Sequence, residues 1–436
     1  MAPGLATFLM FLFLIGGVVI GFPIAFVLSG TAVIFGYVGF GPGIINLFSQ
    51  RVYGLMTNFI MAAIPLFIFM GAMLDKSGIA EAAYDNLYKM LGKLKGGLAI
   101  TTIIVCTLFA ATTGIVGASV TTMGVIALPA MINRNYDKSL ATGVIGAGGT
   151  LGILIPPSIM LVLFAPMAGL SIVKLFSAAI VPGLLLSGLY VLYVVVRTNL
   201  NPEMGPPVPE EDRPPLKESL IGSLKTLVPF LFLILSVLGS IFFGLASPTE
   251  AAGMGAFGSI IIAFFFGGLT WENIKDSLRS TLVITSFVMM VALGANLFTG
   301  VFFGIGGDKV IIDLLMNLGL GSWGVLIVIL FLVFILGMFI DWIGILLILT
   351  PIFMPILTEF GFDPLWSGML IILMLQSSFL TPPFAYSLFY IRGVAPPSVT
   401  IEHIYRGVIP FVLIQLLGLG LAMSFPSIIT WLPSIM

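Results

Sequence analysis

The sequence is dominated by apolar runs long enough to cross a lipid bilayer. The hydrocarbon core of a bilayer is about 30 Å thick, so a spanning helix needs roughly 20 consecutive apolar residues. Of the 436 residues 59% are hydrophobic and only 8% are charged, too few charges for the surface of a soluble domain this large. The sequence therefore predicts an all-α polytopic protein with the bilayer as its main partner. The predicted hydrophobic segments are 5–21, 22–40, 53–74, 97–113, 117–133, 138–168, 174–197, 226–246, 250–269, 279–303, 322–338, 342–358, 364–391 and 404–432.

Charge and rare residues exclude several classes of function. The net charge of −1 provides no basic surface for nucleic acid. A single cysteine, Cys106, excludes an internal disulfide and a cysteine-built metal cage. A single histidine, His403, argues against a histidine metal site or a Ser–His–Asp triad, and we expect it at the membrane interface near a helix start. The sequence thus predicts a protein that is not an enzyme. The first apolar segment lacks a basic start and a small-residue cleavage site, which indicates a retained membrane helix.

A polar, proline-rich stretch divides the chain into two similar halves. Residues 197–219 read RTNLNPEMGPPVPEEDRPPLKES and predict a cytoplasmic linker. Prolines recur in the same order on either side of it, which indicates an internal repeat. The matched positions are Pro129 with Pro351, Pro156-Pro157 with Pro382-Pro383, and Pro182 with Pro410.

The basic residues suggest an orientation for the two halves. If 97–133 and 322–358 are hairpins that enter and leave on one side, only Arg51, Lys174 and Lys309 of the 17 basic residues lie outside. The positive-inside rule favours this arrangement, which places both termini in the periplasm. Each half then crosses an odd number of times, so the halves form an inverted-topology repeat. Such repeats are typical of secondary transporters with a midplane site between broken helices.

Two breaks interrupt apolar segments at matching positions, GTLGILIPPS at 149–158 and SSFLTPPF at 377–384. Proline removes a backbone donor and leaves upstream carbonyls without helical partners. Such carbonyls, with the hydroxyl of Thr150, are hard oxygen ligands that suit Na⁺, while the helix N-terminus after Ser158 suits a carboxylate. Ser377, Ser378 and Thr381 offer the same in the second half. The alternative is a pair of proline kinks that only shape packing.

The hairpin tips are the other candidate sites. Residues 111–122, ATTGIVGASVTT, collect small polar residues, although close helix packing would also explain them. The second tip, 337–344, holds Asp341, the one acid in a long apolar run. An intramembrane carboxylate indicates function, but Asp341 can also cap the helix that starts at Trp342.

Three further features have simpler explanations. Arg392 follows the second break and either attracts an organic anion or, as we favour, anchors a cytoplasmic helix end. Residues 87–97 are basic and amphipathic and predict a helix lying on the surface. Glu250 is expected to cap the helix that begins after Ser247.

These residues together resemble one known family, the large membrane subunits of tripartite ATP-independent periplasmic (TRAP) transporters. The resemblance covers essentially the whole chain. It implies sodium-driven uptake of a small organic anion, usually a carboxylate, across the bacterial inner membrane. It also implies two partners: a periplasmic substrate-binding protein that delivers the solute and a small four-helix membrane subunit. The motifs that carry the resemblance are GTLG at 149–152, IPPS at 155–158, LPAM ending at Met131, GMFID at 337–341, and TPP at 381–383.

The resemblance also implies which residues bind the co-transported ions, two or more Na⁺. The first site falls on Thr113, Gly114, Val116, Gly149 and Gly152. The second falls on Gly337, Ser378, Thr381 and Phe384, mostly through backbone oxygens. The first tip has fewer serines than the family pattern, and Ser378 stands where glycine is usual, which affects side-chain ligation more than carbonyl ligation. Residues expected to contact the substrate or support the ion ligands are Ser119, Thr150, Ser158, Asp341 and Arg392.

An elevator mechanism follows from the same resemblance. Hairpins and broken helices, 97–168 and 322–393, would form a mobile transport domain. The scaffold would comprise 1–96, 169–196, 220–321 and 394–436, with 197–219 as the linker. The alternative function is a stand-alone sodium/dicarboxylate or anion symporter of a related fold. A passive channel is a weaker alternative, because inverted hairpins are explained more simply by alternating access.

Overall fold

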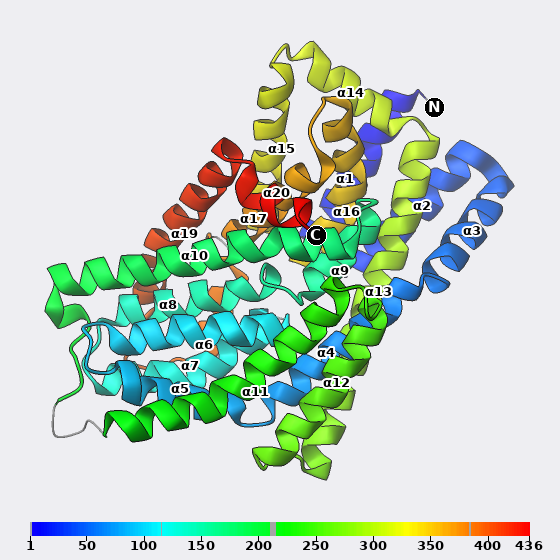
Figure 1. The fold of residues 1–436 in the computed structure, drawn as a ribbon. Helices are drawn as coiled ribbons and strands as arrows, with labels where there is room; N and C mark the ends of the chain where they lie inside the picture. Colours follow the sequence, from blue (N-terminus) through cyan, green and yellow to red (C-terminus); the bar gives the residue numbers. More distant parts are fainter. Residues whose placement is uncertain (1, 115, 210–214, 383–384) are drawn as a thin grey trace.

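The computed structural model describes residues 2–114, 116–209, 215–382 and 385–436, and regular structure in these ranges is helical (Figure 1). The helices of the first half are α1 (Pro3–Ile20), α2 (Ile24–Phe40), α3 (Ile44–Met56), α4 (Ala63–Asp75), α5 (Ile79–Leu91), α6 (Gly97–Thr113), α7 (Val116–Asn133), α8 (Lys138–Thr150), α9 (Ile159–Met167) and α10 (Ile172–Leu200). Those of the second half are α11 (Leu216–Phe242), α12 (Pro248–Phe265), α13 (Trp271–Gly304), α14 (Gly307–Asn317), α15 (Gly321–Gly337), α16 (Trp342–Glu359), α17 (Pro364–Ser378), α18 (Tyr386–Val394), α19 (Ile401–Ser424) and α20 (Ser427–Ser434). Short 3₁₀ turns are η1 (Gly41–Gly43), η2 (Phe59–Ala62), η3 (Leu151–Ile153) and η4 (Pro202–Met204).

Within the described ranges, nine helices are long and apolar enough to cross a membrane, or up to 11 if each sharply bent pair counts as one span. This confirms the prediction of a multi-pass membrane protein. Two predicted segments are divided where the sequence analysis expected continuity. Asn58 accepts a hydrogen bond from the Ile60 amide and starts η2, which splits segment 53–74. Pro426 separates α19 from α20 and splits segment 404–432.

Both predicted breaks are present. Segment 138–168 consists of α8, the turn η3, a non-helical stretch through Ser158, and α9. Segment 364–391 consists of α17 and α18, separated by residues of which 383–384 lie outside the described part. The proline pairs lie within the breaks, where they have no backbone donor to continue a helix.

The helices that lead into the breaks are enclosed by protein. Every residue of α8 from Leu140 to Thr150 and of α17 from Trp366 to Ser378 is buried. By contrast, α1 and α2 carry many exposed large apolar side chains. Non-helical backbone is tolerated at membrane depth only when protein or an internal cavity surrounds it, and this burial meets that requirement.

Each predicted hairpin consists of two short helices that pack against each other, α6 with α7 and α15 with α16. The chain leaves α6 through Gly114, whose φ of +60° is left-handed and favours glycine. Asp341 caps α16 by accepting from the Ile343 amide at 3.2 Å, which confirms the predicted cap. Glu250 and Ser247 form the predicted cap of α12, and His403 lies in the first turn of α19.

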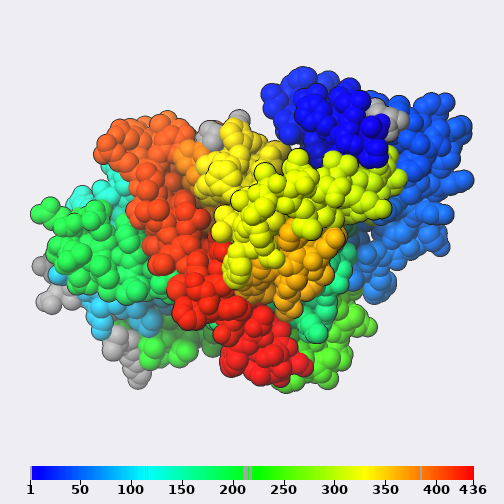
Figure 2. Space-filling view, turned by 90° about the horizontal axis from the view of Figure 1, so that it is seen from above, coloured from blue at the N-terminus to red at the C-terminus, as the bar shows by residue number. Residues whose placement is uncertain are grey.

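Two further helices pack against the second hairpin and the helices that lead into the breaks. Helix α13 packs against α2, α4 and α16, and α19 packs against α8, α10 and α17. Figure 2 shows α19 and α20 (red) running across one face beside the yellow and orange segments, with α1 (dark blue) next to α14. The surface helix predicted at 87–97 is misplaced, because 87–91 forms the end of α5 and residues 92–96 form turns. Helix α5 buries Tyr84 and Leu87 and packs against α6 and α11, so it covers the side of the first hairpin.

The predicted linker is shorter and more ordered at its start than the sequence analysis expected. Helix α10 continues to Leu200, and α11 begins at Leu216. Residues 204–208 form a strap that is hydrogen-bonded to both sides of the first hairpin's base. The bonds run from the Gly96 amide to the Gly205 carbonyl (2.8 Å), from the Val208 amide to the Gly92 carbonyl (2.8 Å), and from the Asp137 amide to the Met204 carbonyl (3.0 Å).

Candidate functional site

The first hairpin tip lies against the first break. A Cβ added to Gly114 would lie 3.0 Å from the Ile159 amide nitrogen, so the tip touches the N-terminus of α9. A Cβ on Gly149 would overlap Val120 of α7. A Cβ on Gly152 would lie 3.8 Å from the Ser119 hydroxyl and 3.7 Å from the Ala110 Cα. The absence of side chains at Gly114 and Gly149 therefore allows the tip and the break to come into close contact, while Gly152 lies at ordinary contact distance.

The residues of the first predicted sodium site lie on these contacting segments, α6, α7, α8 and η3. Val116 begins α7 and is buried, and Thr113 ends α6, although its side chain lies outside the described part. Ser158 precedes α9 and donates its hydroxyl hydrogen to the Ile153 carbonyl at 2.7 Å. The first amides of α9 have no intrahelical acceptors and carry the positive end of its dipole, the predicted anion-favouring feature.

The second hairpin tip also contacts the second break at a glycine. A Cβ on Gly337, at the end of α15, would coincide with the Ser378 hydroxyl at the end of α17. The Ser378 hydroxyl donates to the Leu375 carbonyl at 2.6 Å. The Thr381 hydroxyl donates to the Ser377 carbonyl at 2.8 Å. Gly337 and Ser378 thus end two helices that face each other, and Thr381 follows the second of these helices. Phe384, the fourth predicted ligand, lies outside the described residues.

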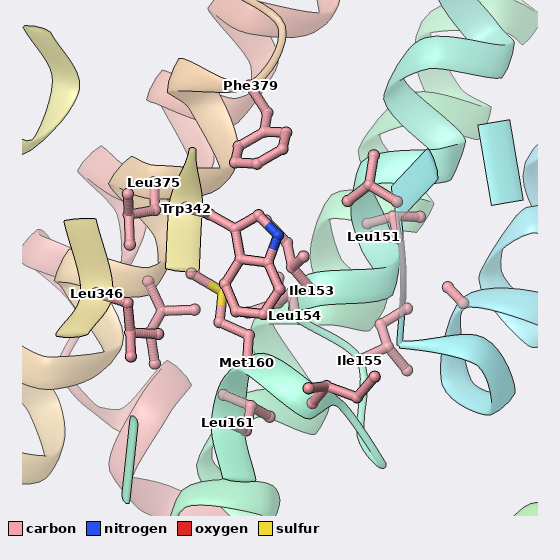
Figure 3. Close-up of a cluster of buried hydrophobic side chains, with 14 of the residues drawn as sticks. Leu151, Ile153, Leu154, Ile155, Met160, Leu161, Trp342, Leu346, Leu375 and Phe379 are labelled. Atoms are coloured by element: carbon pink, nitrogen blue, oxygen red, sulfur yellow. The ribbon is translucent and has the colours of Figure 1, made fainter. Parts of the chain in front are cut away.

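The two breaks approach each other through an apolar cluster. Figure 3 shows the Trp342 ring, at the start of α16, directed toward Ile153 and Leu154 of the first break and Met160 of α9. Leu375 and Phe379 of the second half lie on its other side. Helix α16 packs against α9, so the second hairpin contacts the first broken helix directly. An apolar wall of this kind excludes water and strengthens electrostatic interactions beside it.

Sequence reasoning missed several polar residues around the breaks. The Gln415 amide donates to the Tyr190 hydroxyl at 2.8 Å and to the Thr150 hydroxyl at 3.2 Å, which ties α19 and α10 to the end of α8. The Ser387 hydroxyl donates to the Phe379 carbonyl at 3.0 Å, much as Ser158 does in the first half. Gln376 is fully buried, and its side chain has no hydrogen-bond partner in the described part of the chain.

The remaining predicted residues have local partners. Asp341 is half-buried beside the second tip, where it acts as the cap described above. Arg392 is exposed and donates to the Val399 carbonyl at 2.8 Å, so it joins the end of α18 to the turn before α19. This contact agrees with the favoured anchoring role, whereas substrate contact by Arg392 stays a prediction. No group of three or more His, Cys, Asp or Glu suited to a metal occurs in the described ranges.

Comparison with known proteins agrees with this architecture. The C4-dicarboxylate TRAP transporter large permease protein DctM of Pseudomonas aeruginosa is 32% identical over 400 residues, 91% of each chain. The isethionate TRAP transporter permease protein DctMQ of Oleidesulfovibrio alaskensis is 31% identical over 94% of this chain and 64% of its own length. The crystal structure of the Alcanivorax borkumensis YdaH transporter shares the fold, with a TM-score of 0.66, 16% identity, and coverage of 97% of this chain and 98% of that one. Residues 7–428 match the family model described as the tripartite ATP-independent periplasmic transporter, DctM component, and the chain belongs to this family.

Proposed function

We propose that the chain is the membrane permease for sodium-coupled uptake of a small organic anion in the bacterial inner membrane. The observation that carries the proposal is the contact of each hairpin tip with a broken helix, Gly114 with the start of α9 and Gly337 with Ser378. Relatives named for C4-dicarboxylate and isethionate transport support an acidic solute.

The proposed partners follow from family membership. A periplasmic binding protein delivers the anion, and a small membrane subunit of four helices lies beside the large one. The relative named DctMQ, which is longer than this chain, is consistent with fusion of the two membrane subunits. The stand-alone symporter remains the alternative.

Sodium binding rests on the chemistry of the two breaks. Backbone carbonyls and hydroxyls are hard oxygen ligands, and unwound segments at the midplane use them for Na⁺ in other secondary transporters. The first break is buried throughout, and the helix that leads into the second break is buried as well, so a cation at the first break interacts with these oxygens in a medium of low dielectric constant. We propose that Na⁺ occupies both sites and that the filled sites favour binding of the anion between the tips.

The experiment that tests the function is uptake by the reconstituted complex. Liposomes holding both membrane subunits, with the binding protein outside, are given labelled candidate acids with and without an inward sodium gradient. Uptake at the same rate with and without the sodium gradient would contradict sodium coupling. Sodium-driven uptake that persists without the binding protein and the small subunit supports the stand-alone symporter instead.

The second sodium site makes a specific prediction. Thr381→Val keeps the side-chain volume but removes a hydroxyl that lies 2.8 Å from the Ser377 carbonyl. We expect the sodium concentration for half-maximal uptake to rise about fivefold to tenfold, the effect of losing an interaction worth about 1 kcal/mol. Thr358→Val is the matched control, since Thr358 makes the same kind of bond to Met354 outside the site. An unchanged sodium response in Thr381→Val would show that this hydroxyl is not a ligand.

The proposed inverted topology makes a prediction about accessibility. The native Cys106 is fully buried, so an introduced cysteine gives the main labelling signal. We expect Glu203→Cys to react with an impermeant maleimide only from the cytoplasm and Asp363→Cys only from the periplasm. Glu359→Cys repeats the second test without removing the cap that Asp363 forms on α17. Reaction of both positions from one face would disprove the arrangement.

We propose an elevator mechanism for alternating access, in which 97–168 and 322–393 move together against the scaffold. The two parts contact each other through the Trp342 cluster, which supports their joint movement. Contacts such as those of Gln415 with Thr150 cross the proposed boundary and would break when the parts slide.

A further inference from the structure

A cavity with several polar groups in its lining lies on the proposed boundary, between the first hairpin, the helix that follows the second break, and scaffold helices. It has a volume of about 370 Å³ and opens between α4, α7, α13 and α18. This size is in the range of sites for small organic molecules. Its lining combines scaffold residues with residues of the first hairpin and α18: Gly71, Ala72, Asp75, Lys76, Gly117, Ala118, Thr121, Thr122, Ser277, Ser280, Ile284 and Tyr390.

The cavity contains one acid and one base at its scaffold wall. Half-buried Asp75 ends α4, and its Oδ1 accepts the Thr122 hydroxyl of α7 at 2.5 Å. Among the described residues Thr122 is the one side-chain donor to Asp75, so the carboxylate has capacity for further donors. Lys76 is 3.8 Å from Asp276, and both side chains are about half exposed. An exposed pair at that distance is weak, so the ammonium can exchange partners.

Ser277 provides evidence for a ligand that does not depend on the shape of the cavity. It is 1% exposed, and its hydroxyl has no hydrogen-bond partner in the described ranges. Buried hydroxyls are almost always paired, and an unpaired one costs about 1–3 kcal/mol. Ser280 lies one turn further along α13 and lines the same cavity. Opposite, the Tyr390 ring packs on Gly117, where an added Cβ would lie 2.8 Å from the ring carbon that bears the hydroxyl.

These groups favour one chemical class of solute. The hydroxyls of Ser277, Ser280 and Thr121, with Lys76 at the rim, can donate to a carboxylate. Asp75 can only accept when ionised, so it favours a hydroxyl or ammonium group and repels a second carboxylate. A plain dicarboxylate would therefore bind here less well than an acid that also carries a donor.

We propose that this cavity binds the transported acid in the cytoplasm-facing state, through the α13 hydroxyls and Lys76, and that Asp75 selects molecules bearing both a carboxylate and a hydroxyl or ammonium group. This inference rests on the proposed transport function. It assigns part of the binding site to scaffold helices α4 and α13, outside the hairpins and breaks that hold the proposed sodium ligands. The cavity walls belong to both proposed bodies, so sliding would dismantle the site when the transporter faces outward.

Cysteine protection tests the proposal directly. Ser280 is exposed and lines the cavity, so Ser280→Cys is labelled with an impermeant maleimide in inverted membrane vesicles that contain both membrane subunits. Two series of probes are added. The first series is propionate, lactate and alanine, and the second is succinate, malate and aspartate. Within each series the carbon skeleton is constant and a hydrogen is replaced by a hydroxyl or an ammonium group.

We expect the donor-bearing acids to halve the labelling rate at a concentration about tenfold lower than the plain acid of the same series, as for one hydrogen bond to a charged group. In an Asp75→Asn background this difference should disappear, although the asparagine oxygen can still accept from Thr122. Leu278→Cys, an exposed position on α13 that does not line the cavity, should be protected by none of the probes.

Three results would overturn the inference: no probe protects Ser280→Cys, plain and donor-bearing acids protect equally, or the difference survives in Asp75→Asn. Sodium-driven uptake by the reconstituted complex, measured in parallel, separates this failure from failure of the proposed function. Uptake that remains sodium-driven while protection is absent disproves the cavity assignment alone. Uptake that does not depend on sodium disproves the proposed sodium-coupled function.

Discussion

Gly337→Ala should reduce sodium-driven uptake by about tenfold or more. The added methyl group would occupy the position of the Ser378 hydroxyl, so the end of α15 must move away from α17. Overpacking at a closely packed position costs about 1–3 kcal/mol, enough for a tenfold change in an equilibrium. The measurement is initial uptake in proteoliposomes, normalised to the amount of folded permease found by size-exclusion chromatography.

A second substitution distinguishes local crowding from general destabilisation. Ser378→Gly removes the side chain that the new methyl group would meet, so Gly337→Ala with Ser378→Gly should regain much of the lost uptake. Gly188→Ala is the control, because an added Cβ there meets nothing within 4 Å. Wild-type uptake by Gly337→Ala alone, or no recovery in the folded double variant, would contradict the proposed contact of tip and break.

Crosslinking α4 to α7 should stop uptake completely and reversibly. On α7, Val125 is 59% exposed, whereas Thr122, one turn away, contacts Asp75 of α4, which belongs to the proposed scaffold. Cysteines at Asp75 and Thr122 should form a disulfide under mild oxidation and hold the two proposed bodies in one register. Uptake should fall to background after oxidation and return after reduction to the level that the same double variant shows before oxidation.

Cysteine pairs at other contacts ensure that the crosslinking test does not depend on a single position. Thr107 with Ser187 and Thr150 with Gln415 also join the proposed moving part to the scaffold, through contacts of 2.7 and 3.2 Å. Arg51 with Asn296 joins two scaffold helices and serves as the control, which should keep its uptake when crosslinked. If the crosslinked boundary pairs all transported at the normal rate, sliding would be excluded and local opening of each hairpin would replace it.

The sequence predicted features that depend on short stretches of chain. Proline pairs located both breaks, because two consecutive residues without backbone donors interrupt a helix more strongly than the single prolines that lie inside α7, α10 and α19. Asp341 was recognised as a helix cap by its position before Trp342, and the structure confirms it. Asn58 acts in the same local way but was missed, because the surrounding apolar run suggested an uninterrupted helix.

The parts of the site that could not be predicted depend on packing between distant segments. Gln415 and Thr150 are separated by 265 positions in the chain, and no local pattern connects them. Asp75 ends an ordinary apolar helix, and only the approach of α7 places the Thr122 hydroxyl against it. The inferred ion ligands were found through resemblance to a family, and the structure adds which of them touch. Their role in binding sodium stays a prediction.

The strap at residues 204–208 bears on how the protein is made. Its hydrogen bonds reach back to Gly92 and Gly96, which leave the ribosome roughly a hundred residues earlier. At about 5–20 residues per second, the base of the first hairpin therefore waits on the order of ten seconds for its last backbone partners. Synthesis of residues 204–208, just after α10, is thus the step that completes the base of the first hairpin.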